Sequence, residues 1–266
     1  MKNINRIKKL KSLANKMRKT ILEVSLNCGE SAHIGGGLSI VEILATLYGE
    51  IMNLNLKKPS DRFVLSKGHG FLGLLSVLHC KKFISKKEIM KFQTDGSELI
   101  AHPIVNPKFG IESSNGSLGQ GLSFGAGLAI AYKKKNKKNS VFVLVGDGEC
   151  YEGSIWEAAI ACTESSLDNL TVIVDCNGFQ NDGAINKKMN SKELLKKWKG
   201  FGWDTFACDG HNIVELLKVF KKKTSKPKAI IAKTIKGKGV SFMEKNNDWH
   251  HGRLTKKLFD LAIKQI

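Results

Sequence analysis

Two strand-like segments of this sequence each end near a side chain that carries a metal-binding oxygen. Asp147 follows the apolar segment 141–145, and Asn177 follows the segment 170–175. A helix-like stretch, 154–163, separates them, so the three segments form a strand–helix–strand unit with adjacent parallel strands. Both side chains would emerge at the carboxyl edge of the sheet, where open α/β sheets bind ligands. Their oxygens suit Mg²⁺, which takes further oxygens from phosphate.

The turn around Asp147 is open to several interpretations. Gly146 and Gly148 flank Asp147 and allow the backbone to approach a phosphate closely, although Gly-Asp-Gly is also a common turn. A dinucleotide-binding fingerprint starts correctly here but requires a third glycine where Tyr151 stands. The sequence contains no Walker motif. A metal-bound phosphate is therefore the hypothesis that the remaining motifs must support or weaken.

Four histidines stand beside glycines or prolines in predicted loops: His33, His69, His102 and His251. A single loop histidine is usually only solvated. Four of the seven histidines in such turns favour a cluster that binds hydroxyl groups and moves protons near neutral pH.

The elements that would position these residues alternate along the chain. Strands are expected at 141–145, 170–175, 203–207 and 229–234, with helices between them. This alternation predicts an α/β fold with a mostly parallel sheet and helices on both faces. With 266 residues, few prolines and no long polar tract, we expect residues 1–266 to form a single domain.

The N-terminal half offers further helix signals. Apolar residues recur at helical spacing over 3–27. Ser39, with Glu42 three positions later, predicts a capping box that begins a helix at Ile40. The segment 119–132 predicts a helix rich in small residues, and its glycines indicate close approach of another backbone or a ligand.

The net charge of +19 raises the possibility of nucleic-acid binding. Only four of the 43 basic residues are arginine, the usual reader of bases and bidentate binder of phosphate. We therefore expect mostly solvated lysines, no nucleic acid, and a secondary attraction of anionic sugar phosphates. The six cysteines form no Cys-x-x-Cys pair, and neither a secretion signal nor an apolar membrane span occurs, which predicts a cytoplasmic protein with reduced thiols.

Several motifs in a fixed order resemble those of transketolases. They are 61–70 (DRFVLSKGHG), 116–121 (GSLGQG), 146–153 (GDGECYEG) and 234–240 (TIKGKGV). The resemblance runs from about His33 to His251 and covers the thiamine-diphosphate-binding, N-terminal part of that family. It implies the thiamin diphosphate-binding fold.

The resemblance also implies roles for individual residues. Asp147, Asn177 and the backbone carbonyl of Phe179 would ligate Mg²⁺, or Ca²⁺ or Mn²⁺ in its place. The other cofactor-binding residues would be His69, Gly116, Ser117, Leu118, Gly146, Gly148 and Glu152. Of these, Glu152 matches a family glutamate at a subunit interface. The alternative interpretation of Glu152 is a carboxylate in the first turn of a helix, where the helix dipole favours a negative charge.

The four histidines, His33, His69, His102 and His251, match the family's catalytic histidines. His250 is adjacent to His251, and the glycine after His251 favours the latter. Lys236 and Lys238 could contact phosphate, but a solvated turn is the preferred interpretation. Ser117 and Ile34 stand where the family usually has proline, which leaves the acceptor sugar open.

The resemblance does not extend to the family's pyrimidine-binding and C-terminal domains, which we expect on a separate chain. It implies a two-chain transketolase, with a heterotetramer and two sites, that transfers a two-carbon ketol unit from a ketose donor to an aldose acceptor. A related enzyme acting on a modified sugar, or one like deoxyxylulose-phosphate synthase, is an alternative. A non-catalytic nucleic-acid-binding or scaffold protein is the alternative from a different class.

Overall fold

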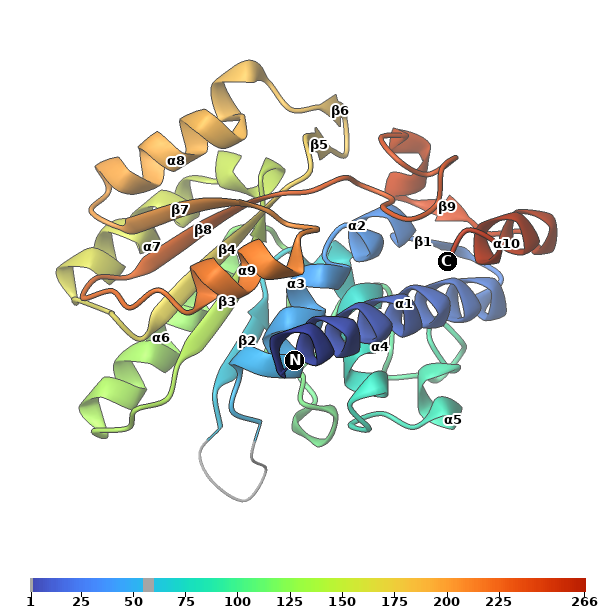
Figure 1. Cartoon of the computed structure of the whole chain (residues 1–266), viewed down its shortest axis with the longest axis horizontal. Helices are drawn as coiled ribbons and strands as arrows, with labels where there is room; N and C mark the ends of the chain where they lie inside the picture. Colours follow the sequence, from blue (N-terminus) through green and yellow to red (C-terminus); the bar gives the residue numbers. More distant parts are fainter. Residues whose placement is uncertain (1, 55–59) are drawn as a thin grey trace.

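A five-stranded parallel sheet forms the centre of the computed structural model, which describes residues 2–54 and 60–266. The strand order is β2-β3-β4-β8-β7, and every neighbouring pair is parallel (Figure 1). The predicted α/β class is thus confirmed. The strands are β2 (Arg62–Leu65), β3 (Val141–Gly146), β4 (Leu170–Cys176), β7 (Asp204–Asp209) and β8 (Lys228–Lys233).

Helices cover both faces of this sheet because its strands are apolar on both sides. Along β3, Val141, Val143 and Val145 pack with helices of one face, whereas Phe142 and Leu144 pack with helices of the other. The helices on the valine side are α6 (Gln120–Lys134), α7 (Gly153–Glu164) and α8 (Ser191–Gly200). Those on the other side are α1 (Lys2–Cys28), α3 (Val41–Thr46), α4 (Phe71–Cys80) and α9 (Ile213–Phe220).

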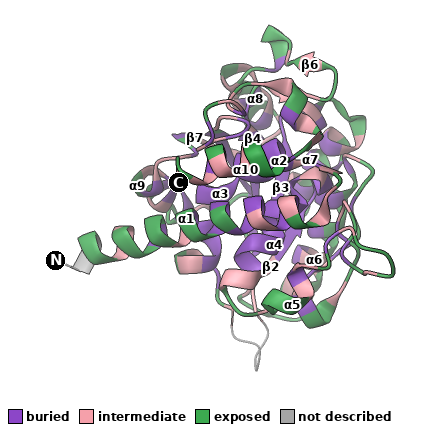
Figure 2. Cartoon of the chain, turned by 90° about the vertical axis from the view of Figure 1, so that its right-hand side faces the viewer, coloured by how far each residue is buried: buried purple, intermediate pink, exposed green. Residues whose placement is uncertain are grey.

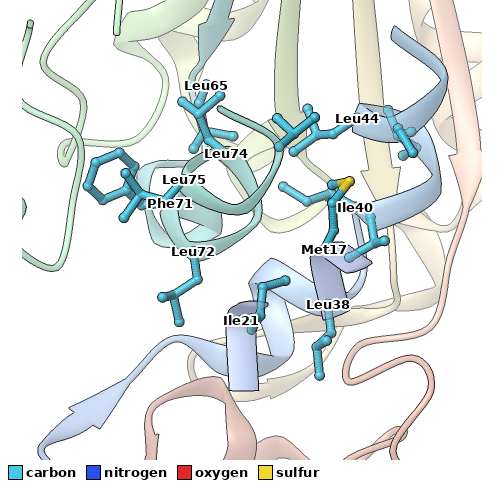
Figure 3. Packing of buried hydrophobic residues seen from close by; sticks show 14 of the residues in the cluster. Met17, Ile21, Leu38, Ile40, Leu44, Leu65, Phe71, Leu72, Leu74 and Leu75 are labelled. Atoms are coloured by element: carbon cyan, nitrogen blue, oxygen red, sulfur yellow. The ribbon is translucent and has the colours of Figure 1, made fainter. Parts of the chain in front are cut away.

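The long helix α1 crosses the molecule and packs on α3 and α4. Met17 and Ile21 of its apolar stripe are completely buried, in one cluster with Leu38, Ile40 and Leu44 of the neighbouring segments (Figure 3). Residues 4–9 of α1 are exposed or partly exposed, and this end of the helix extends beyond the core (Figure 2). The helix predicted over 3–27 is confirmed.

Two pairs of very short strands lie outside the central sheet. β1 (Ser31–Ala32) pairs antiparallel with β9 (Gly252–Arg253), and β5 (Phe179–Gln180) pairs with β6 (Gly183–Ala184). The first pair brings the beginning and the end of the predicted site together. The remaining short elements are α2 (Ile34–Leu38), η1 (Leu47–Ile51), η2 (Gly68–Gly70), α5 (Lys86–Ile89), η3 (Pro107–Phe109), η4 (Gly148–Tyr151), η5 (Lys187–Met189), η6 (Asn247–His250) and α10 (Lys256–Ile263).

The predicted capping box at Ser39 is wrong. Ser39 ends α2, and its hydroxyl lies within hydrogen-bond distance of two acceptors, Oδ2 of Asp175 (2.7 Å) and the Gly36 carbonyl (3.0 Å). Helix α3 follows Ile40, which offers no side-chain cap. The Glu42 carboxylate instead forms a buried ion pair with Arg18. Both side chains therefore bind partners that are distant in the sequence, and the local cap does not form.

Candidate functional site

Asp147 and Asn177 lie at the carboxyl ends of β3 and β4, side by side as predicted. The two strands are paired up to Gly146 and Asp175, and the Asp147 amide donates to the Asp175 carbonyl over 3.2 Å. The Asp147 carboxylate then accepts from the amides of Gly148 (2.9 Å) and Gly178 (2.7 Å). These bonds hold the carboxylate across the ends of both strands.

A buried carboxylate fixes the orientation of the Asn177 amide. Oδ2 of Asp175 accepts from Nδ2 of Asn177 (2.9 Å), so the Asn177 oxygen faces away from Asp175 and accepts from the Phe179 amide (3.0 Å). Asp175 also forms an ion pair with Lys67. Burial alone would raise the pKa of Asp175, but the Lys67 ammonium and the hydrogen bonds hold that pKa below its ordinary value.

The electrostatics at Asp147 fit a bound cation. Burial and the charge of Asp175 raise the pKa of Asp147 to about 6, so an added cation would stabilise the ionised carboxylate. Within residues 2–54 and 60–266, no group of three or more His, Cys, Asp or Glu side chains could hold a metal. The predicted ligand set of one carboxylate, one amide oxygen and one peptide carbonyl would leave several Mg²⁺ positions to phosphate and water, as is usual for this ion.

Glu149 joins two glycine-containing turns at the same edge. Its buried carboxylate accepts from the amides of Gly119 (2.9 Å) and Gly146 (3.0 Å) and from the hydroxyl of Ser66 (2.5 Å). Burial raises the pKa of Glu149. The turn around 116–119 is thereby tied to the turn that carries Asp147.

A cavity of about 360 Å³ opens over these turns. Every predicted site residue lines it except Ser117 and His251, which are exposed. The predicted residues that it brings together are His33, His69, His102, Gly116, Leu118, Gly146, Asp147, Gly148, Glu152, Asn177 and Phe179. Sequence reasoning missed Glu149, Tyr151, Gln180, Asn181 and Asp182, and it preferred His251 to His250, which lines the cavity.

Five histidines form one cluster, and four of them, all except His251, line the cavity. The His33 ring centroid lies 5.2 Å from that of His102, 5.4 Å from His250, 4.7 Å from His251 and 6.0 Å from His69. Burial, followed by the neighbouring histidines, lowers the pKa of His33 to about 3. The His33 ring is therefore neutral at pH 7, so it offers one donor and one acceptor.

His33 has a ring nitrogen available for a ligand. Its Nδ1 is buried and has no hydrogen-bond partner among the described residues. Buried polar atoms are nearly always paired in native proteins, so an unpaired one beside a cavity indicates a group that a ligand completes.

His250 and His251 differ in their surroundings. His250 lines the cavity and stacks on His69 with centroids 5.4 Å apart, whereas His251 is exposed beside His33. Burial and the charge of Lys236 lower the pKa of His250 to about 4. The pairing of β1 with β9 carries both histidines to His33.

The expectation of a solvated turn at Lys236 is wrong. Lys236 is 1% exposed, and its ammonium donates to Nδ1 of His250 (2.6 Å) and to Oδ1 of Asn247 (3.0 Å). Burial lowers the pKa of Lys236 to about 8. Lys238 is only partly exposed and pairs with Glu244 over 3.1 Å. The two lysines of one motif therefore have different surroundings.

Short sequence signals were available for some of the missed residues. Lys67 lies between Ser66 and His69 in a motif already singled out, and Glu149 directly follows Gly148. Nothing local marked Asp175 as buried. Across the part of the chain that the structure describes, no helix has both the length and the apolar character needed to cross a membrane.

Comparisons with known proteins show the family to which this chain belongs. The family model described as transketolase, thiamine diphosphate binding domain, matches residues 11–264. The chain is 38% identical to one subunit of the apulose-4-phosphate transketolase of Phocaeicola vulgatus, covering 98% of this chain and 94% of that protein. It is 37% identical to the 6-deoxy-6-sulfo-D-fructose transketolase subunit SqwG of a Clostridium species, covering 97% and 96%.

Longer relatives share the same region. Human transketolase is 35% identical over 98% of this chain, which spans 42% of the human protein. The crystal structure of transketolase from Campylobacter jejuni superposes with a TM-score of 0.85 at 28% identity, covering 96% of this chain and 42% of that one. The structure from Leishmania mexicana also gives 0.85, at 26% identity, with coverage of 95% and 40%.

Proposed function

The chain belongs to the family of the transketolase thiamine diphosphate binding domain, and from this premise we propose that it is the diphosphate-binding subunit of a two-chain transketolase. In the proposed reaction a two-carbon ketol unit passes from a ketose donor to an aldose acceptor. The observation that carries this proposal is the meeting of two oxygen ligands, Asp147 and Asn177, with a wall of neutral histidines in one cavity.

The family's cofactor, thiamine diphosphate with a divalent metal ion, fits the residues present. Asp147, Asn177 and the Phe179 carbonyl would hold Mg²⁺, with Ca²⁺ or Mn²⁺ able to take its place. Gly146 and Gly148 would lie along the diphosphate. When bound, the cofactor supplies the electron sink for breaking and forming a carbon–carbon bond beside a carbonyl. Gly116, Ser117 and Leu118 would lie beside the aminopyrimidine or thiazolium ring. His69 would contact the diphosphate oxygens or the substrate, and Glu152 would lie at the subunit interface.

The chain's own contribution to the chemistry would come from the histidine cluster. Neutral imidazoles accept a proton from a hydroxyl at one nitrogen and donate at the other, which suits the binding of sugar hydroxyls. His33 offers an Nδ1 that pairs with no residue in the described part of the chain. His102 lines the same wall, and His250 does so in the place expected for His251. The proton-moving role would fall to these groups and to His69.

A second subunit would complete the active site. We propose that residues 1–266 form one diphosphate-binding domain and that the partner carries the pyrimidine-binding and C-terminal domains. Two relatives that this chain covers almost entirely are named as transketolase subunits, and the chain spans only 42% of human transketolase. The assembly would be a cytoplasmic heterotetramer with two sites.

An anionic sugar is the substrate class that the charge favours. The net charge of +19 attracts sugar phosphates at long range. Relatives with similar coverage are named for apulose-4-phosphate and for 6-deoxy-6-sulfo-D-fructose. A modified sugar with a phosphate or sulfonate group is therefore the second candidate, ahead of a reaction like that of deoxyxylulose-phosphate synthase.

The decisive experiment isolates this chain from its native cells under mild conditions and identifies the bound protein and small molecules by mass spectrometry. We expect a partner with a pyrimidine-binding domain together with thiamine diphosphate. The purified assembly is then assayed with phosphorylated and sulfonated ketose donors. If nucleic acid accompanies the chain and cofactor is absent, the non-catalytic binding function takes the lead.

A further inference from the structure

We propose that Arg18, Glu42 and His211 act together as positioning residues that hold Lys236 against His250. We call these three side chains the loop clamp. The inference deepens the proposed function, on which it rests for its purpose, since His250 lines the proposed active site. None of the three clamp residues lines the cavity, and none was predicted as a site residue.

The clamp holds the backbone on both sides of Lys236. Nε2 of His211 accepts from the amide of Ile235 over 2.8 Å, one residue before Lys236. Nε of Arg18 donates to the carbonyl of Lys238 over 3.1 Å, two residues after it. The backbone around Lys236 is therefore anchored to two side chains from distant elements, the turn before α9 and helix α1.

Glu42 connects the two anchors. Its Oε1 accepts from Arg18 Nη2 (2.5 Å), and its Oε2 lies 2.9 Å from Nδ1 of His211. Because Nε2 of His211 accepts from a backbone amide, the ring proton must lie on Nδ1, where it is donated to Glu42. Burial alone would raise the pKa of Glu42, but the His211 hydrogen bond and the Arg18 charge hold that pKa below its ordinary value.

Two glycines leave the anchored segment little room to move. Gly237 has φ of +80°, and a side chain there would meet the Met243 carbonyl at 2.2 Å. Gly239 has φ of +98°, and a side chain there would lie 2.7 Å from Nε of Arg18. Gly239 thus packs directly against Arg18 of the clamp, and Gly237 packs against the backbone of Met243.

The position of this segment decides where the Lys236 ammonium lies. From its fixed backbone, Lys236 reaches Nδ1 of His250 at 2.6 Å. The groups that face His250 are Lys236, Lys67, His33, His69, His251 and Asp182. Loss of the clamp would withdraw the nearest cation from His250 and leave the other groups in place.

The experiment measures the His250 imidazole in the full chain by NMR titration, without cofactor or partner. The resonance is assigned by its absence in His250→Gln. Lys236→Met removes the cation and should raise the pKa of His250 by about one unit. His211→Ala should raise it by a similar amount, and the double variant no further, since both changes act through one contact.

Matched variants separate positioning from general damage. His211→Gln can still accept from Ile235 and donate to Glu42, so it should restore the wild-type value. His79→Ala removes another histidine that holds a loop, through Ile84, and should leave His250 unchanged. Arg18→Lys keeps the charge but cannot bind both partners, so it should raise the pKa even if His211→Ala fails to fold.

An unchanged His250 pKa in folded His211→Ala and Arg18→Lys would overturn the proposal. Additive effects of His211→Ala and Lys236→Met would overturn it as well. Absence of transketolase activity in the assembled protein would overturn the proposed function and leave this measurement intact, because the titration requires neither cofactor nor partner.

Discussion

Lys67 and Asp175 form an ion pair in which neither side chain is exposed to solvent. Asp175 contacts both residues whose side chains are predicted to bind the metal. Its carboxylate accepts from Nδ2 of Asn177, and its carbonyl accepts from the Asp147 amide. Removing one partner of a buried pair leaves an uncompensated charge. The pair therefore links the stability of the sheet edge to the orientation of Asn177.

Asp175→Ala should lower the free energy of unfolding by about 3–5 kcal/mol, because the Lys67 ammonium would stay buried without its counter-ion. Chemical denaturation of the full chain measures this loss. The double variant with Lys67→Met should lose less than the sum of the two single changes, because it leaves no unpaired charge. Strictly additive losses would contradict the coupling.

Asp147→Asn should weaken the joint binding of Mg²⁺ and thiamine diphosphate to the assembled enzyme by about 100-fold or more, since even groups behind a metal ligand contribute 10–100-fold. Calorimetric titration measures the affinity. Asp182→Asn is the matched control, because Asp182 lines the same cavity but is not in the predicted ligand set. Equal losses in both variants would argue for a general charge effect.

His33 should make the chain less stable as the pH falls below about 6.5. Burial and neighbouring histidines lower the pKa of folded His33 to about 3, whereas the unfolded ring titrates near 6.5. Between these values the unfolded state binds the extra proton, so the free energy of unfolding falls with decreasing pH. The slope is at most about 1.4 kcal/mol per pH unit for one group, and partial exposure of the ring reduces it.

Denaturation curves at pH values of about 6.5, 6.0, 5.5 and 5.0 test this dependence. This range lies above the pH at which most carboxylates titrate. His33→Gln should give a flatter profile than the wild type. His79→Gln should retain the wild-type slope, since His79 lies outside the cluster and binds the Ile84 carbonyl. A wild-type slope in His33→Gln would show that another group controls acid stability.

The sheet and the position of Asp147 and Asn177 could be predicted because both follow from local pattern. Continuous apolar runs mark buried parallel strands, and the parallel order fixes which edge the following residues share. Strand pattern does not place His33, His69 and His102 near each other. That expectation comes from the family resemblance. The pairing that brings His250 and His251 to His33, between two-residue strands at 31–32 and 252–253, is too short to show any periodicity.

The buried charges could not be predicted from local pattern. The spacing of Glu42 from Ser39 fits a helix cap, yet Glu42 binds Arg18 and His211, the latter 169 positions away. Lysine in a glycine-rich turn is usually solvated, yet Lys236 is buried. In both cases the deciding contacts are long-range, and composition gives no measure of how deeply a side chain is buried.

The small residues of α6 give a final prediction with an internal control. A side chain at Gly121 would lie 2.5 Å from Oγ of Ser66, and Ser66 binds Glu149, whereas Gly127 on the same helix has nothing within 4 Å. Gly121→Ala should therefore destabilise the chain by about 1–3 kcal/mol through overpacking. Gly127→Ala should stabilise it by about 0.5–1 kcal/mol, because alanine is the better helix former. Thermal unfolding of the two variants measures both effects, and a loss in Gly127→Ala equal to that in Gly121→Ala would contradict the assigned packing of α6.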